Sequence, residues 1–129
     1  MKIQAEISVG ELFDKITILN IKLKKINDPN KLLNVKTELD ILMEQSKKII
    51  LNNKEKFNKL VKKLEDINEK LWDIENIKRQ CEANKDFGDT FIKISRDVHF
   101  KNDLRASIKK EINLLSNSRI TEEKEYSKY

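Results

Sequence analysis

The chain has 129 residues with only two glycines and one proline, which argues against a strand-rich fold with many turns and favours one domain of a few long helices. Its 27 basic and 22 acidic residues give a net charge of +5, but no third of the chain is strongly basic, so a nucleic-acid partner has little support. Because no apolar run approaches a membrane span or a signal peptide, we expect a cytoplasmic protein that has no membrane partner.

The N-terminal stretch, residues 1–7, alternates polar and apolar side chains, a pattern typical of extended chain. A helix opens directly after it, because Ser8 and Glu11 have the spacing of a capping box. Apolar residues three and four positions apart continue as far as Ile26, where we expect this first helix to end. The sequence therefore predicts an extended lead followed by an amphipathic helix.

A second helix is predicted after Asp28, which suits its cap, with Pro29 at the first helical position and an apolar seam that reaches Ile49. Residues 51–54 allow two interpretations. Two asparagines suggest a break between helices, but neither Gly nor Pro enforces one. The apolar register slips there by only about one residue, as a stutter in a continuous helix allows. The sequence leaves this boundary open.

The most regular apolar spacing in the chain predicts a third helix from Lys54 to Lys85, about 48 Å long at 1.5 Å per residue. After a short turn, Asp89 suits the cap of a fourth helix that ends near Asn117. Residues 117–129 are polar and highly charged, as in a mobile tail. Two long helices and a polar tail therefore make up the second half of the chain.

These elements predict an all-α fold, in which residues 1–129 form a single bundle of three or four long antiparallel helices with coiled-coil-like packing. A helix of about 48 Å is longer than a globule of this mass is wide. Shorter helices of the same chain would then leave part of its apolar seam uncovered. We therefore expect a homo-oligomer, with a dimer favoured.

One stretch of the fourth predicted helix breaks the apolar rhythm. Lys101, Arg105 and Lys109 stand four residues apart, at or beside positions where core residues are expected. If the third and fourth helices form an antiparallel hairpin, the acids opposite these three bases are, in order, Asp73, Glu69 and Glu65. We favour this interhelical pairing. The alternative is a site for the phosphate or carboxylate of a small anionic ligand.

The residues that usually carry catalysis give little support for an enzyme. Cys81 lies on the apolar seam, as a buried thiol does, and His99 has no second histidine with which to bind a metal. Glu11, Asp14 and acids of the third helix admit one alternative, an all-α nucleotide pyrophosphohydrolase that holds Mg²⁺ between carboxylates. Neighbouring lysines neutralise these acids, and phosphate-loop and nucleophile motifs are absent. We therefore expect no metal and no cofactor, and favour a protein without catalysis of its own.

Five stretches have patterns more specific than apolar periodicity: SVGELFDKITIL (8–19), NEKLWDIE (68–75), KDFGDTFI (85–92), NDLRASIKKEIN (102–113) and EEKEY (122–126). Together they resemble an uncharacterised family of small all-helical bacterial proteins, a domain of unknown function. The resemblance covers nearly the whole chain except residues 30–57, which implies that the second helix is a support element. It also implies a loose association with surface-polysaccharide or glycosyl-transfer pathways.

The resemblance also adds a set of polar residues on the first, third and fourth helices, which we take as a ligand or partner patch. The candidate residues are Glu11, Asp14, Lys15, Trp72, Glu75, Arg79, Asn102, Asp103, Arg105, Lys109 and Asn113. We predict a non-catalytic binding or interaction module whose partner is a protein or a small anionic ligand. The alternatives are the Mg²⁺-dependent enzyme and an electrostatic nucleic-acid binder.

The composition of the tail alone predicts disorder, since it carries many charges and few large apolar groups. However, Thr121 suits the cap of a short helical turn, and Glu122 and Tyr126 offer a carboxylate and an aromatic ring to the bases of the patch. We therefore predict that residues 119–126 fold back onto the patch of the same chain or of a dimer mate.

Overall fold

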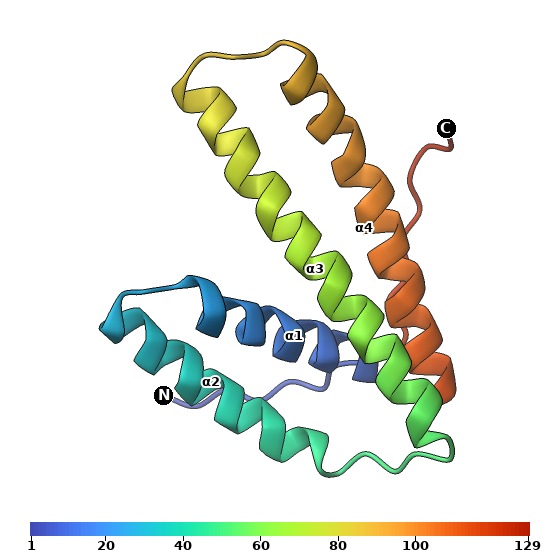
Figure 1. The fold of residues 1–129 in the computed structure, drawn as a ribbon. Coiled ribbons are helices and arrows are strands. Elements are labelled where there is room, and N and C mark those ends of the chain that lie inside the picture. Colours follow the sequence, from blue (N-terminus) through green and yellow to red (C-terminus); the bar gives the residue numbers. More distant parts are fainter.

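The computed structural model describes all 129 residues, which form four helices and no strand. The helices are α1 (Val9–Lys25), α2 (Pro29–Ser46), α3 (Lys54–Ala83) and α4 (Asp89–Leu115). In Figure 1, α3 and α4 form a hairpin, α1 crosses the lower half of that hairpin, and α2 lies beside α1. The all-α prediction is confirmed. None of the four helices has the length and apolar character needed to cross a bilayer.

The helices begin where the sequence supplies capping side chains. The Ser8 hydroxyl accepts a hydrogen bond from the backbone N–H of Glu11, and the Asp28 carboxylate accepts two from the first turn of α2. The Asn53 side chain caps α3 in the same way. Residues 47–53 are not helical, so α2 and α3 are two separate helices, and the boundary that the sequence left open is settled.

Several predicted helix bounds differ from the structure by one to three residues, and α3 ends at Ala83 rather than Lys85 and α4 at Leu115 rather than near Asn117. α2 ends at Ser46, so Ile49, the last residue of the predicted apolar seam, lies beyond the helix. The N-cap of α4 is Gly88, so Asp89 lies in the first turn of the helix, where its negative charge complements the helix dipole. These shifts leave the core-facing sides of the helices unchanged.

Both helices of the hairpin end in a sharp turn that contains a left-handed residue. Lys85 after α3 and Asn117 after α4 each have a φ of 52°. After α4, the N–H of Ser118 donates to the carbonyl of Asn113 at 2.9 Å, which is the bond that defines a Schellman turn. This turn reverses the chain and brings the start of the tail next to α1.

The main core lies where α1 crosses the hairpin. Its six buried side chains come from α3 and α4 and are Phe57, Leu60, Leu64, Ile67, Ile108 and Ile112. The ring of Phe13 on α1 meets the Phe57 ring edge-on, with the ring centres 4.9 Å apart. α2 packs on α1 alone and buries a single residue, Val35, so it covers α1 from outside.

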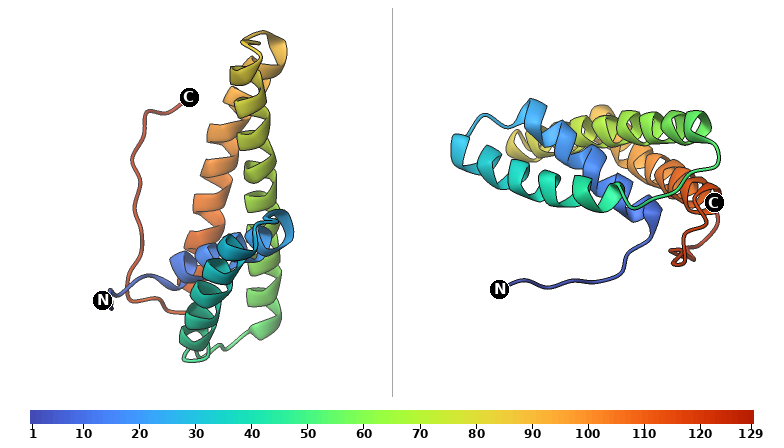
Figure 2. Two further views of the ribbon diagram at one scale, coloured as in Figure 1. Left: turned by 90° about the vertical axis from the view of Figure 1, so that its left-hand side faces the viewer. Right: turned by 90° about the horizontal axis from the view of Figure 1, so that it is seen from below.

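The distal half of the hairpin projects beyond α1 and α2 (Figure 2). Its own apolar cluster has only three buried residues, Ile74, Cys81 and Ile94. The prediction that Cys81 is a buried free thiol is confirmed. This half is a two-helix arm that no third helix covers.

Both ends of the chain are extended. Residues 1–7 lead away from the start of α1, and residues 118–129 run back alongside α4 (Figures 1 and 2). The predicted helical turn at Thr121 is wrong, because the tail contacts α4 at points from Lys109 to Asp103. An extended segment spans this distance, whereas a helix of the same length is less than half as long.

Candidate functional site

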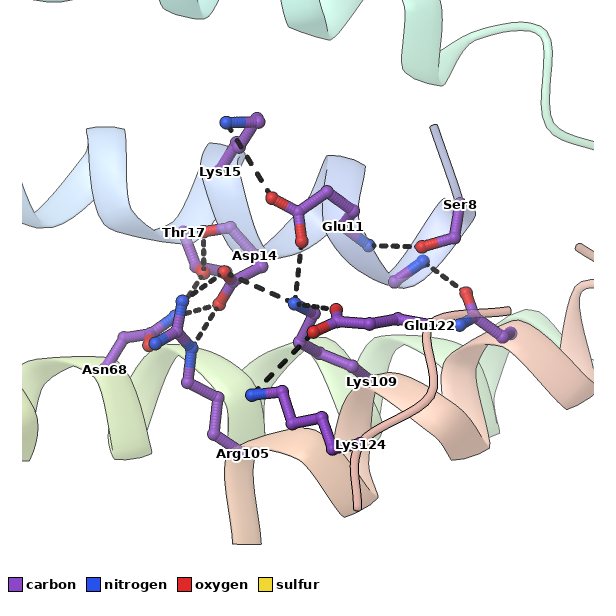
Figure 3. A network of polar contacts seen from close by, with 12 residues as sticks. Ser8, Glu11, Asp14, Lys15, Thr17, Asn68, Arg105, Lys109, Glu122 and Lys124 are labelled. Carbon is purple, nitrogen blue, oxygen red and sulfur yellow. Dashed lines mark hydrogen bonds and ion pairs between the residues drawn. The ribbon is translucent and has the colours of Figure 1, made fainter. Parts of the chain in front are cut away.

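A network of polar side chains joins α1 to α3, α4 and the tail. It begins with Asp14 and Thr17, which lie on the side of α1 that faces the hairpin and are only 2% and 1% exposed. Their spacing of three residues places both on one helical face. Figure 3 shows that their partners converge on them from α3 and α4, while the tail reaches the network through Lys109. The interior of this protein therefore contains charge beside its apolar core.

The Asp14 carboxylate is held by three donors. The Arg105 guanidinium makes two hydrogen bonds to it, one from Nε to Oδ1 at 2.9 Å and one from Nη2 to Oδ2. The Asn68 amide donates to Asp14 Oδ1 at 2.9 Å and to Thr17 Oγ1 at 3.0 Å. The Thr17 hydroxyl donates in turn to the backbone carbonyl of Asp14. Each of these side-chain groups thus has a partner, as buried polar groups require.

Lys109 is the second buried charge of the network. Its side chain is 9% exposed, and its Nζ donates to Glu11 Oε2 at 2.7 Å and to Glu122 Oε2 at 2.9 Å. The same ammonium lies 3.8 Å from Asp14 Oδ2. Two of its three acidic partners belong to α1, whereas Glu122 belongs to the tail. Lys109 is therefore the point at which the tail joins the network.

The surroundings favour the charged form of each group. Burial acts to raise the pKa of Asp14, but hydrogen bonds from Arg105 and Asn68 outweigh it, so the pKa lies below its ordinary value. Burial acts to lower the pKa of Lys109, but hydrogen bonds to its two glutamate partners raise it above the ordinary value. The hydrogen bond from Lys109 lowers the pKa of Glu122. Asp14, Lys109 and Glu122 are therefore charged at neutral pH.

The start of α1 lies directly against α4. The N–H of Gly10 donates to Asn113 Oδ1 at 2.6 Å, and the N–H of Val9 donates to Ser118 Oγ at 3.1 Å. These side chains satisfy N–H groups that the first turn of a helix leaves without partners. A Cβ atom on Gly10 would lie 2.6 Å from the backbone oxygen of Lys109. Glycine at this position therefore allows the two backbones to approach each other.

The predicted pairing of the basic stripe with α3 is wrong. Arg105 and Lys109 face the acids of α1, and Lys101 forms no ion pair. Glu65 and Glu69 pair instead with two lysines near the C-terminal end of α1, at 3.7 and 3.6 Å. The prediction considered only α3 and α4, and it left out α1, which crosses the hairpin and offers its own charged side chains. α1 supplies acids at one end and lysines at the other, so it supplies partners for charges on both helices.

The structure brings six of the candidate residues into this network or onto its edge: Glu11, Asp14, Lys15, Arg105, Lys109 and Asn113. Asn102 and Asp103 lie farther along α4, where they face the tail. Trp72, Glu75 and Arg79 lie apart, on the distal half of α3, where Trp72 is half-buried and Arg79 pairs only with Glu75. The patch is therefore centred on α1 and α4.

Three residues of the network were missing from the prediction: Gly10, Thr17 and Asn68. Thr17 and Asn68 each directly follow an apolar seam residue, whereas Gly10 has no side chain and gives no such signal. Asn68 directly follows Ile67 in α3 and is 5% exposed. An uncharged polar residue next to the core side of a helix was the available signal, since such a residue needs a partner when it is buried.

Two hollows lie where the tail runs along α4. The smaller one, the lysine pocket, has a volume of about 240 Å³ and is lined chiefly by Lys109, Lys110, Lys124, Glu122 and Glu123. The larger one, the aromatic groove, has a volume of about 1020 Å³, and its lining includes His99, Asn102, Asp103, Tyr126 and Tyr129. Lys124 borders both hollows, so they are neighbours.

The end of the tail closes one side of the aromatic groove. The Tyr129 hydroxyl donates to Asp103 Oδ2, and this hydrogen bond raises the pKa of Tyr129. The Tyr129 ring meets the rings of His99 and Phe100 edge-on, with ring centres 5.1 and 5.0 Å apart. The prediction that the tail folds back onto its own chain agrees with this arrangement, although the tail is extended.

The carboxylates considered for Mg²⁺ do not come together. No group of three or more His, Cys, Asp or Glu side chains is placed to hold a metal ion. Asp14 is bound by Arg105 and Asn68, and the α3 acids that the hypothesis requires pair with lysines of α1 or of α3 itself. The geometry therefore provides no ligand cluster for a metal-dependent enzyme of that type.

Comparison with known proteins adds one finding. No curated protein and no solved structure matches the chain. The whole chain, residues 1–129, matches a sequence family described as a family of unknown function (DUF6165). This match confirms the resemblance to a domain of unknown function that the five sequence stretches indicated. The chain is therefore a member of the DUF6165 family, and its four helices give a fold for the full length of the matched region.

Proposed function

We propose that the chain is a non-catalytic binding module for an anionic small molecule, whose phosphate or carboxylate group takes the place of Glu122 beside Lys109. The observation that carries this proposal is that the three acids around the buried Lys109 ammonium come from segments of different stability. Glu11 and Asp14 are fixed on α1 by packing, whereas Glu122 lies in an extended segment. Glu122 is thus the one partner that can leave without unfolding a helix.

The lysine pocket suits an anion when the tail glutamates leave it. Lys109 and Lys110 both belong to α4 and remain in place when Glu122 and Glu123 move away. When Glu122 leaves, the Lys109 ammonium keeps Glu11 and Asp14 as acidic partners, and the N–H that it donated to Glu122 becomes free for an anion oxygen. A phosphate offers more acceptor oxygens and more charge than the carboxylate that it would replace.

The ion pairs on either side of Glu122 add little to its hold on Lys109. Glu123 lies 4.0 Å from Lys110, with both side chains more than half exposed. Arg119 lies 3.2 Å from Glu6, with side chains 84% and 52% exposed. Exposed ion pairs of this kind contribute about 0–1 kcal/mol each. Displacement of Glu122 and Glu123 therefore depends mainly on the contact between Glu122 and Lys109, while Tyr129 keeps its separate contacts with α4.

The aromatic groove indicates what else the ligand contains. His99, Tyr126 and Tyr129 present ring faces or edges to it, and Asn102 and Asp103 offer hydrogen-bonding groups. Aromatic rings in a groove suit a planar ring of the ligand, while an adjacent cationic pocket suits its charged end. We therefore propose a ligand that joins a planar ring to a phosphate or carboxylate group.

Calorimetric titration of the full chain tests this proposal, with ADP, pyrophosphate and adenosine as probes. We expect ADP to bind more tightly than either fragment, because only ADP fills both hollows. Glu122→Gln should strengthen binding of ADP and pyrophosphate several-fold, because it removes the competing charge. Lys110→Glu should weaken both, whereas Lys47→Glu, the same change at an exposed position just after α2, should leave them unchanged.

Two results would contradict the proposal. One is the absence of binding of all three probes, at millimolar concentration, to the wild type and to the Glu122→Gln variant. The other is binding that Lys110→Glu does not alter, which would place the anion outside the lysine pocket. A steep loss of affinity for arbitrary DNA with added salt would favour the nucleic-acid binder instead.

Three finer expectations belong to this proposal. The apolar seam of α3, with Leu60, Leu64 and Ile67 buried, supports antiparallel coiled-coil-like packing between α3 and α4. The single buried Cys81 is consistent with the cytoplasm as its location, since no disulfide is involved. An accessory role in surface-polysaccharide or glycosyl-transfer pathways rests on the resemblance alone.

A further inference from the structure

The lead, residues 1–7, is an extended segment whose backbone has no partner. All seven residues are exposed, and none of their N–H or C=O groups takes part in a backbone hydrogen bond. The one contact of note is between Glu6 and Arg119, an exposed pair at 3.2 Å. An extended segment with unpaired amide groups is a template for pairing with another strand. The structure therefore offers a free strand edge next to α1.

The charges of the lead fit a second copy of itself. In an antiparallel pair centred on Gln4, residue i faces residue 8 minus i of the other copy. Lys2 then faces Glu6, and Ile3 faces Ala5, on each side of the two-fold axis. Opposite charges that face each other across a strand pair are favourable, whereas like charges are unfavourable. This order of charges is self-complementary, as a two-fold symmetric interface requires.

The lead also borders an uncovered apolar surface. The lead and α2 border a groove of about 1040 Å³, and nine of its fourteen lining residues are hydrophobic, among them Ile3, Ile7, Ile41 and Ile49. Ile3 is 82% exposed and Ile41 is 58% exposed. In the antiparallel pair, the isoleucines of both leads lie on one face and the charges on the other. A two-stranded ribbon therefore has an apolar face that can cover this groove.

We infer that two copies of this chain form a symmetric dimer in which their leads pair as an antiparallel ribbon over the groove beside α2. The occupant of the groove is the lead of the second copy. A two-stranded ribbon alone is marginally stable, and the apolar contact with α2 supplies the packing that it needs. This interface lies away from the lysine pocket and does not depend on the proposed ligand.

Exchange of charges between the two positions tests the ribbon directly. We expect the wild type to sediment as a dimer, and Lys2→Glu or Glu6→Lys alone to raise the dissociation constant roughly tenfold, because each places two pairs of like charges opposite each other. The double variant Lys2→Glu with Glu6→Lys should restore the wild-type value. Both positions are exposed, so circular dichroism should show unchanged helix content in all variants.

One control variant separates this contact from the pair within the chain. Arg119→Ala removes the partner of Glu6 in the same chain and should leave the dissociation constant unchanged. A wild type that sediments as a 15.3 kDa monomer at millimolar concentration would overturn the inference. So would a dimer whose dissociation constant is the same in the wild type, both single variants and the double variant.

Discussion

The two halves of the α3–α4 hairpin differ in what a third helix adds to them. Where α1 crosses, six side chains form a buried core and charged groups lie inside the protein. Beyond α1, only three residues of the arm are buried, and its charges remain at the surface. Two helices packed along one seam leave most of each helix in water. The crossing of a third helix is what makes a buried charged network possible.

Two arginine–acid pairs make this difference concrete. Arg79 and Glu75 form a pair in the distal half, with side chains 77% and 59% exposed. Arg105 and Asp14 form a pair under α1, with side chains 29% and 3% exposed. An exposed pair contributes little to stability, whereas removal of one partner from a buried pair leaves an uncompensated charge. The same chemical groups therefore have different consequences in the two halves.

The largest effect is expected for Asp14→Ala. This change leaves the Arg105 guanidinium without its buried carboxylate partner, and removal of one partner from such a pair costs roughly 3–5 kcal/mol of unfolding free energy. Glu75→Ala in the distal half should change stability by less than about 0.5 kcal/mol. Urea denaturation of both variants measures the contrast. Equal effects of the two changes would remove the distinction between the halves.

The second effect concerns the two glycines. Gly10→Ala places a methyl group 2.6 Å from the backbone oxygen of Lys109, and overpacking of this kind costs roughly 1–3 kcal/mol or more. Gly88→Ala, at the distal turn, meets only a flexible Asp86 side-chain oxygen at 3.3 Å and should alter the Tm little. Thermal melting followed by circular dichroism compares them. A Gly10→Ala protein with the wild-type Tm would show that α1 and α4 do not approach so closely.

The elements of the fold were predictable from the sequence because their signals are local. Ser8 and Asp28 cap helices in their own vicinity, and the apolar seam of α3 is visible without knowledge of its partner. The partners of Arg105 were not predictable, because Asp14 is 91 residues away and lies on a helix whose crossing angle the sequence does not specify. Gly10 was missed for the same reason, since the need for glycine at this position comes from the close approach of the α4 backbone.

The third effect is a dependence of stability on pH. The pKa of Asp14 lies below its ordinary value of 3.8, so its contribution is present above that pH and is lost as pH falls through the lower, folded-state pKa. The pKa of Lys109 lies above its ordinary value of 10.5, so its contribution is present below that pH and is lost as pH rises through the raised pKa. Stability should therefore fall at both extremes.

Unfolding free energies of the wild type and of Asp14→Asn, measured between pH 5 and pH 2, test the acid side. The variant lacks this titrating group, so its stability should fall less steeply with decreasing pH. Asp40→Asn, an exposed position on α2, serves as the control and should keep the wild-type slope. Identical slopes in all three proteins would contradict a lowered pKa at Asp14.

The smallest effect is expected for Glu122→Gln. Lys109 keeps Glu11 and Asp14 as partners, and Glu122 is 42% exposed, so the cost should be about 1 kcal/mol or less. Amide hydrogen exchange in residues 118–129 should become faster, while exchange in α1 stays slow. Glu125→Gln, which forms no ion pair, is the matched control. A loss of several kcal/mol would mean that the tail is part of the core and cannot be displaced.

The pairing of Arg105 with α1, and not with its hairpin partner α3, underlies the buried network. Two double-mutant cycles test it most directly, one combining Arg105→Met with Asp14→Asn and one combining Arg105→Met with Glu69→Gln. We predict a coupling energy of roughly 1.5–3 kcal/mol in the first cycle, because the two side chains share buried hydrogen bonds. In the second cycle we predict additivity within about 0.5 kcal/mol, since Glu69 pairs with Lys25. Additivity with Asp14 and strong coupling with Glu69 would show instead that Arg105 pairs with α3.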